Sequence, residues 1–166
     1  AGANQAYFVA DEIAKRNIPV IIGTELTPND YRDDPVTAPW RNASVLRDKG
    51  VKIAFTTSFS PEGVSEIRNL PYEAARAVSY GLSEDEGMRA LTLSAAEILG
   101  VADKLGSLDA GKRADLIITD GNPMQILTHV ERMWIGGEEM SLASHHTQLY
   151  WQFKNRGRNA VTTPIQ

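Results

Sequence analysis

The sequence contains no cysteine in its 166 residues, and this absence removes several kinds of chemistry at once. Disulfide bridges, thiolate nucleophiles and cysteine-built zinc sites are all excluded. No apolar run reaches the roughly 18 to 20 residues that span a bilayer, and residues 1–16 lack the basic and then apolar order of a signal peptide. We therefore expect a soluble chain without a membrane partner, in the cytoplasm or the periplasm.

Basic residues are slightly outnumbered, with 17 Lys and Arg against 21 Asp and Glu, so the formal net charge is -4. This balance argues against a surface that binds nucleic acid. The hydrophobic fraction of 42% is that of an ordinary soluble domain. The chain begins at Ala1 and not at Met, so we also consider a processed or truncated start.

The first half of the chain alternates between helical and strand patterns. Apolar residues at helical spacing predict helices over 5–16 and 40–49, and each is followed by a short apolar run, at 18–22 and 51–55. Runs this short and this uniformly apolar are typical of strands buried on both faces. The alternation therefore predicts an α/β fold with parallel strands, in an open sheet or a barrel.

The middle of the chain is predicted to be helical. Pro71 fits the first turn of a helix that runs to about Tyr80. Two capping-box patterns follow, Ser83 with Glu86 and Ser94 with Glu97, and each predicts the start of a short helix.

The residue pattern changes after Gly100, where glycines separate short β-prone runs at 114–119 and 130–135. Gly136 and Gly137 follow the second run and predict a hairpin turn. These runs are expected to form a separate small sheet.

Few side chains suggest chemistry by themselves. The three histidines are His129, His145 and His146, and the adjacent pair points in different directions on a helix or a strand, so we expect exposed residues and not metal ligands. The loop after the first strand carries Asp30 and Arg32, and Arg68 ends the loop after the second. Both loops follow carboxyl ends of strands, which makes these three residues candidate substrate contacts, with ordinary surface or ion-pair roles as the alternative.

Three segments carry a specific resemblance: ALTLSAAEILG at 90–100, LGSLDAGKRADLIITDGNP at 105–123, and the run from Val130 to Gly137. Together they closely resemble the C-terminal signature of the metal-dependent amidohydrolase superfamily, particularly members similar to imidazolonepropionase and Xaa-Pro dipeptidase-type enzymes. Ser94-Ala95 stands where the family usually has Asn-Pro.

The resemblance implies a fold in which a (β/α)8 barrel is joined to a small β-sandwich, the composite domain. Residues 1–100 would be the C-terminal strands and helices of the barrel, 101–142 a β-sandwich segment, and 143–166 a C-terminal tail. A complete barrel needs at least about 200 residues. We therefore expect the C-terminal part of a longer enzyme.

The resemblance also implies a metal site that this chain does not complete. The family holds one or two divalent ions, zinc being expected in an intact member, with histidines, often a carboxylated lysine, and an Asp after the last barrel strand. None of the earlier ligands has a counterpart here, and Ser58 occupies the position of the Asp. A neutral hydroxyl is a poor metal ligand and no general base near neutral pH. No metal ligand is therefore assigned within the chain.

The functional prediction is a fragment of a hydrolase acting on C–N bonds in non-peptide amides, cyclic amides or dipeptides, inactive by itself. Its expected partner is the missing N-terminal portion of the same protein or another copy in a homo-oligomer, because unpaired strands associate. Two alternatives stay open. One is a non-catalytic binding or assembly module on the same framework, and the other is a free-standing α/β enzyme using Ser58, Asp30 or His145.

Overall fold

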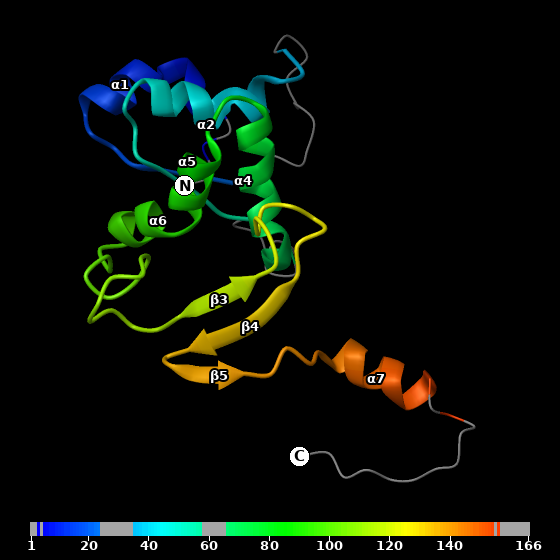
Figure 1. Cartoon of the computed structure of the whole chain (residues 1–166). Helices are drawn as coiled ribbons and strands as arrows, with labels where there is room; N and C mark the ends of the chain where they lie inside the picture. The colour runs from blue at the N-terminus through cyan, green and yellow to red at the C-terminus, as the bar shows by residue number, and fades with distance from the viewer. Residues whose placement is uncertain (1–2, 4, 24–34, 58–65, 155, 157–166) are drawn as a thin grey trace.

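The computed structural model describes residues 3, 5–23, 35–57, 66–154 and 156, and it places a helical part with two parallel strands beside a small antiparallel sheet (Figure 1). In chain order the elements are η1 (Ala6–Val9), α1 (Ala10–Lys15), β1 (Val20–Ile22), α2 (Ala38–Asp48), β2 (Ile53–Phe55), η2 (Ile67–Asn69), α4 (Leu70–Ser79), α5 (Glu84–Leu91), α6 (Leu93–Ile98), β3 (Leu116–Thr119), β4 (Val130–Ile135), β5 (Glu138–Met140) and α7 (His145–Lys154). None of the helices in these ranges is both long and apolar enough to cross a bilayer.

The two strands β1 and β2 pair in parallel, as the sequence predicts, with Val20 opposite Ile53 and Ile22 opposite Phe55. Each begins two residues later than expected. Pro19 precedes β1 and has no N–H to donate, and the N–H of Val51 donates to the carbonyl of Leu46, 3.0 Å away, at the end of α2. The strands are therefore shortened by the connections that lead into them.

The core lies where helices α2, α4, α5 and α6 pack on β2. Its centre includes Ile22 and Leu46, both 0% exposed. The amide of Asn42 on α2, also 0% exposed, ties the start of the chain to this core. Its Oδ1 accepts from the N–H of Tyr7 at 3.0 Å and its Nδ2 donates to the carbonyl of Ala3 at 2.8 Å.

One of the two predicted capping boxes is confirmed and the other is wrong. At α5 the Oγ of Ser83 accepts from the N–H of Glu86, and the Glu86 carboxylate accepts from the N–H of Ser83. At α6 the helix instead begins at Leu93, and Ser94 is a buried residue inside it. Only Thr92 separates α6 from α5, so the position of the second helix is set by packing and not by a side-chain cap.

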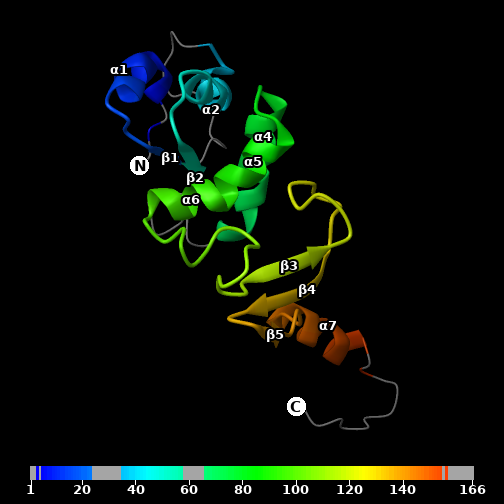
Figure 2. The same cartoon turned by 60° about the vertical axis from the view of Figure 1, so that its left-hand side comes forward.

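The antiparallel sheet has the order β3–β4–β5, and β4 and β5 are joined at Gly136 and Gly137, whose φ angles are +62° and +87°. This confirms the predicted hairpin, because positive φ at both central residues is the geometry that glycine adopts without strain. Figures 1 and 2 show this sheet at one end of the helical part.

Met124, in the connection from β3 to β4, joins the sheet to the helices. It is 5% exposed and packs over Gly87 of α5, where a Cβ atom would lie 3.2 Å from its sulfur. The glycine therefore makes room for the methionine.

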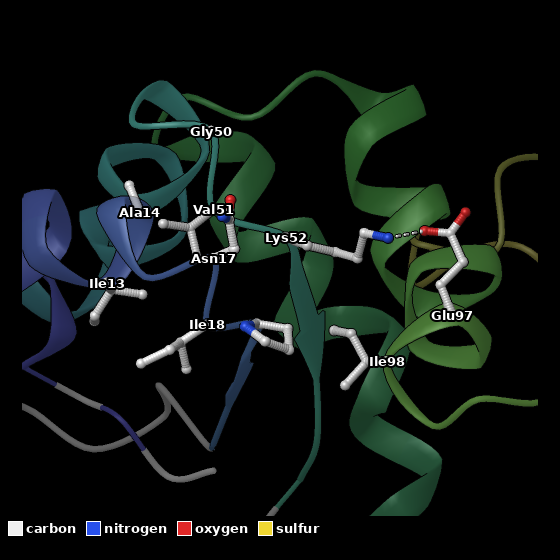
Figure 3. A pocket seen from close by; sticks show the side chains of 10 residues that line it. Ile13, Ala14, Asn17, Ile18, Gly50, Val51, Lys52, Glu97 and Ile98 are labelled. Carbon is white, nitrogen blue, oxygen red and sulfur yellow. Dashed lines mark ion pairs between the residues drawn. The ribbon is translucent and has the colours of Figure 1, made fainter.

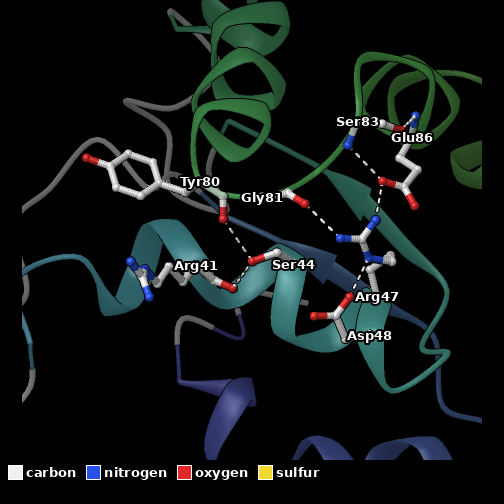
Figure 4. Close-up of polar contacts among 8 residues, drawn as sticks. All are labelled: Arg41, Ser44, Arg47, Asp48, Tyr80, Gly81, Ser83 and Glu86. Carbon is white, nitrogen blue, oxygen red and sulfur yellow. Dashed lines mark hydrogen bonds and ion pairs between the residues drawn. The ribbon is translucent and has the colours of Figure 1, made fainter.

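A polar cluster links α2 to the α4–α5 connection (Figure 4). The guanidinium of Arg47 bonds the carboxylate of Glu86 and donates to the carbonyl of Gly81 at 2.7 Å. Ser44 Oγ lies 3.0 Å from the carbonyl oxygen of Tyr80. The hydrogen bond from the backbone of Ser83, followed by that from Arg47, lowers the pKa of Glu86 below its ordinary value. One carboxylate thus both caps α5 and holds it against α2.

We expect Glu86→Gln to destabilise the fold by about 1 kcal/mol at pH 7, the usual cost of losing a helix-cap contact. The side chains of Arg47 and Glu86 are 33% and 36% exposed, so water screens their ion pair and the loss stays small. Because the pKa of Glu86 is lowered on folding, its contribution is present above the unfolded pKa of about 4.3 and is lost as the pH falls through the folded value. Urea unfolding at pH 7 and pH 3 measures this, with the exposed Glu84→Gln as control. A loss that does not shrink at pH 3 would contradict it.

Truncation of Met124, which links the sheet to the helices, is expected to lower the free energy of unfolding more than Glu86→Gln does. Met124→Ala empties a buried site and should lower the free energy of unfolding by about 2 to 5 kcal/mol. Leu127→Ala, in the same connection, is the matched control because Leu127 is 83% exposed. Equal losses from the two substitutions in urea unfolding would show that Met124 does not anchor the sheet.

Candidate functional site

The carboxyl ends of β1 and β2 form the edge where parallel α/β folds place their binding and catalytic residues. The pairing continues one step beyond the strands, because the N–H of Thr56 donates to the carbonyl of Ile22 at 2.9 Å. Gly23 and Thr57 follow the two strands, and both are buried, Thr57 at 7% exposure. The two loops with the predicted substrate contacts leave from this edge.

The predicted site residues are only partly covered by the structure. Ser58, Asp30 and Arg32 lie outside the described residues. Arg68 is described, and it is an exposed residue of η2 immediately before α4. The structure therefore places Arg68 on the surface near the start of the helix that follows β2.

Sequence reasoning missed Glu73, which has a carboxylate buried to 1% exposure in the first turn of α4. A carboxylate is expensive to bury, and strongly buried ionisable groups concentrate at functional sites as well as in structural networks. In a β-loop-α unit the first turn of the helix lies toward the carboxyl end of the preceding strand. The signal available in the sequence was weak: Glu73 sits on the helix face that carries Ala74 and Ala77, both buried.

The histidines lie away from this edge and on the surface. His145 and His146 are exposed residues of α7. His129 is also exposed, and its N–H donates to Asp120 Oδ1 at 2.7 Å while its Nδ1 lies 3.1 Å from Oδ2. The hydrogen bond from the His129 backbone is the main reason that the pKa of Asp120 is lowered. Within the described ranges, no three His, Asp or Glu side chains gather in an arrangement that could hold a metal ion.

A pocket of about 350 Å³ opens at the opposite edge, by the amino ends of β1 and β2 (Figure 3). Its lining is apolar apart from an ion pair and one amide, and consists of Ile13, Ala14, Asn17, Ile18, Pro19, Gly50, Val51, Lys52, Glu97 and Ile98. The ion pair joins Lys52 Nζ to Glu97 Oε2 at 2.7 Å, and Arg89 Nη2 bonds the other oxygen of Glu97 at 2.9 Å. The hydrogen bond from Lys52 is the largest of the effects that lower the pKa of Glu97.

The two edges therefore differ in what they can do. At the amino edge the carboxylate is neutralised by two cations, which suits it to hold α6 against β2 and not to accept a proton. At the carboxyl edge Thr57 is buried, and Glu73 lies in the first turn of α4, the helix that follows β2 and η2 in the chain. The sequences that follow the two strands, 24–34 and 58–65, are rich in polar residues. Parallel α/β folds place binding and catalytic residues at the carboxyl edge.

Comparison with known proteins adds a family. Residues 36–144 match the model of the amidohydrolase family, which covers α2, β2, α4–α6 and the whole antiparallel sheet. The match ends just before α7.

Individual relatives agree with this match. The imidazolonepropionase of Clostridium tetani is 35% identical over 83 residues, which are 49% of this chain and 20% of that protein. The imidazolonepropionase of Geobacillus kaustophilus is 38% identical over 104 residues, 58% of this chain and 24% of that protein. The crystal structure of an amidohydrolase from Thermotoga maritima superposes with a TM-score of 0.70 at 32% identity, covering 83% of this chain and 35% of that one. This chain thus covers about a quarter or less of the two imidazolonepropionases and about a third of the Thermotoga maritima protein.

The ion pair at the amino edge gives a test by titration. Lys52→Ala is expected to raise the pKa of Glu97 toward its ordinary value, and to raise it more than Arg89→Ala does, because the Lys52 hydrogen bond is the largest cause of the lowering. Carboxyl NMR titration measures both. Lys49→Ala is the control, because Lys49 pairs with Asp11 at 2.6 Å and leaves Glu97 untouched. A larger rise of the Glu97 pKa in Arg89→Ala than in Lys52→Ala would contradict this prediction.

Proposed function

Because the chain belongs to the amidohydrolase family, we propose that it is the C-terminal part of a metal-dependent hydrolase that cleaves C–N bonds in amides, cyclic amides or dipeptides. The observation that carries the proposal is the family match over 36–144 in a chain that covers only 20% to 24% of its curated relatives. The cyclic amide ranks first among substrate classes, because several of the matching relatives are imidazolonepropionases.

We propose that β1 and β2 are the last two strands of a (β/α)8 barrel. Their parallel pairing, their burial and the helices packed on β2 support this assignment. A two-stranded parallel sheet is marginal by itself, and parallel strands normally lie inside larger sheets covered on both faces. The outer edge of each strand would then pair with barrel strands from the missing N-terminal portion.

The sheet β3–β4–β5 would belong to the small sandwich of the same family. Its outer strands β3 and β5 each have one edge without a strand partner in the described part of the chain. Most of its apolar side chains, such as Ile117 and Ile135, are exposed to between 41% and 48%. Strands from the missing portion would extend an edge and cover one face. In this proposal the barrel segment would precede Gly100 and the sandwich segment would follow it.

Amidohydrolases are generally metal-dependent, and the described residues of this chain do not fit such a metal. Their histidines are exposed and separate from the carboxyl edge, and no group of three donors occurs among them. The ligands would have to come from other segments. This chain would supply the wall of the site at Gly23, Thr57 and the two loops that follow them, with Arg68 or Arg32 as contacts for a substrate carboxylate.

The test compares this chain with a longer version of the same protein. We expect residues 1–166 alone to show no hydrolysis of a cyclic imidazolone amide or of an Xaa-Pro dipeptide, with or without added zinc. The longer protein should hydrolyse at least one of them and lose that activity to a chelator. Turnover by the isolated chain at a rate comparable with the longer protein would overturn the proposal.

Ser58 makes a second function testable, because a serine in place of the family's Asp favours a non-catalytic assembly module. If the longer protein is inactive and Ser58→Asp gives it zinc-dependent turnover, the module is the better assignment. Ser60→Asp is the matched control, with the same change two residues along. Normal activity that Ser58→Asp leaves unchanged or lowers would exclude the module.

A further inference from the structure

The last segment of the chain differs in charge from everything before it. Residues 141–166 contain three of the 17 basic residues, Lys154, Arg156 and Arg158, and none of the 21 acidic ones. The remaining 14 basic and 21 acidic residues give residues 1–140 a formal charge of -7. The segment also lies almost wholly beyond the family match, which ends at residue 144.

The helix of this segment, α7, carries an exposed aromatic face. Leu149, Tyr150 and Phe153 follow the i, i+1, i+4 spacing of one helix face, and both rings are 55% exposed. Lys154 Nζ lies 5.1 Å from the ring centre of Tyr150, and the guanidinium of Arg156 lies 5.2 Å from that of Phe153. No residue of α7 is buried. In Figure 1 the helix lies beyond the end of β5, away from the other helices.

One face of the antiparallel sheet carries a complementary stripe. The register places Ile117, Met133 and Met140 side by side across the three strands, and Ile135 lies on the same face of β4. Ile117, Ile135 and Met140 are 48%, 45% and 41% exposed. Glu138 shares this face because it is opposite Ile135. Glu131 is two residues before Met133, at the irregularity in the β3–β4 register. The other face carries the Arg132–Glu139 ion pair, with Arg132 stacked 4.5 Å from the ring centre of Trp134.

We propose that α7 of one copy docks on this sheet face of a second copy, in a reciprocal exchange that forms a dimer. The aromatic face of α7 would cover the stripe of Ile117, Met133 and Met140, while Lys154 and Arg156 meet Glu131 and Glu138. The dimensions agree. Three strands about 4.8 Å apart set the outer side chains of the stripe about 10 Å apart. The aromatic face from Leu149 to Phe153 rises about 6 Å along the helix, so the stripe is long enough to cover it.

Docking of α7 on the sheet of a second copy is favoured over docking on the sheet of its own chain. In the single chain α7 buries none of its residues, although only residues 141–144 separate it from β5. The last segment is basic and the rest of the chain is acidic. This charge complementarity favours docking of α7 on another copy of the chain over docking on an unrelated partner. Exchange between two copies also closes the assembly, because each copy supplies one helix and one sheet face.

The absence of cysteine makes a direct test possible. Met133→Cys and Tyr150→Cys are made as separate single variants of the full chain, mixed, and equilibrated in a glutathione buffer. Only contact between different molecules can join position 133 to position 150. We expect a disulfide-linked dimer of about twice 18.2 kDa, with the 133–150 peptide pair identified by mass spectrometry. Phe8→Cys replaces Tyr150→Cys in the control, because Phe8 is 64% exposed but lies outside α7.

A charge exchange separates specific docking from simple collision. Lys154→Glu should shift the unmodified chain from dimer to monomer in sedimentation, and adding Glu138→Lys should restore the dimer. Circular dichroism checks that each variant is folded. A folded mixture that gives no 133–150 pair, or gives no more than the Phe8→Cys control, overturns the proposal. So does a 133–150 bond formed within one chain of the double-cysteine variant, or binding to anionic lipid vesicles by a chain that stays monomeric.

Discussion

The pairing of β1 with β2 is the contact on which the rest of this structure depends. Two strands of three residues each make few hydrogen bonds, so their stability comes from the side chains buried around them. Helices α2, α4, α5 and α6 all reach β2, and small residues make this possible. The buried Ala43, Ala74, Ala77 and Ala90 let the helices approach closely while the larger Ile22 and Leu46 fill the space between them. The absence of one helix would expose the strands to water.

Charged groups reinforce this arrangement from the outside and give its two edges different characters. At the amino edge, Glu97 binds Lys52 and Arg89 and so joins α6 to the start of β2 and to α5. Farther out, Glu86 links α5 to Arg47 on α2. The carboxyl edge presents the buried residues Gly23 and Thr57.

The antiparallel sheet and α7 show how much apolar surface remains without a cover in one chain. Met124 fixes the sheet to the helices, but apolar side chains on both faces of the sheet, such as Ile117 and Ile118, stay near half exposed. Hydrophobic side chains at this exposure contribute only part of the stabilising free energy that complete burial would provide. Both proposals follow from this observation. Missing strands of the same protein would cover one edge and one face of the sheet. The helix of a second copy would cover the opposite face.

Much of the fold could be read from local sequence. The positions of α2 and α4, the box at Ser83 and Glu86, and the glycine hairpin at 136–137 follow from spacing and backbone preference, because these signals act within a few residues. The family could be read as well, since its signature lies in contiguous segments. The failed box at Ser94 shows the limit: the pattern was present, but the short connection at Thr92 and the burial of Ser94 decided where α6 begins. The candidate site was the least predictable part, because the burial of Glu73 depends on elements that meet only in three dimensions.

Sequence by itself determined the family, the alternation of helices and strands as far as β5, and the charge difference between the last segment and the rest, because each depends on residues that are close together in the chain. It did not determine α7, since residues 143–166 were predicted only as a tail. Tertiary structure alone decided which charges pair, which carboxylate is buried and which apolar side chains line up on one sheet face. Ile117, Met133 and Met140 are unremarkable in the sequence. They form one stripe because the register of three strands places them side by side, and register is a property of the folded sheet.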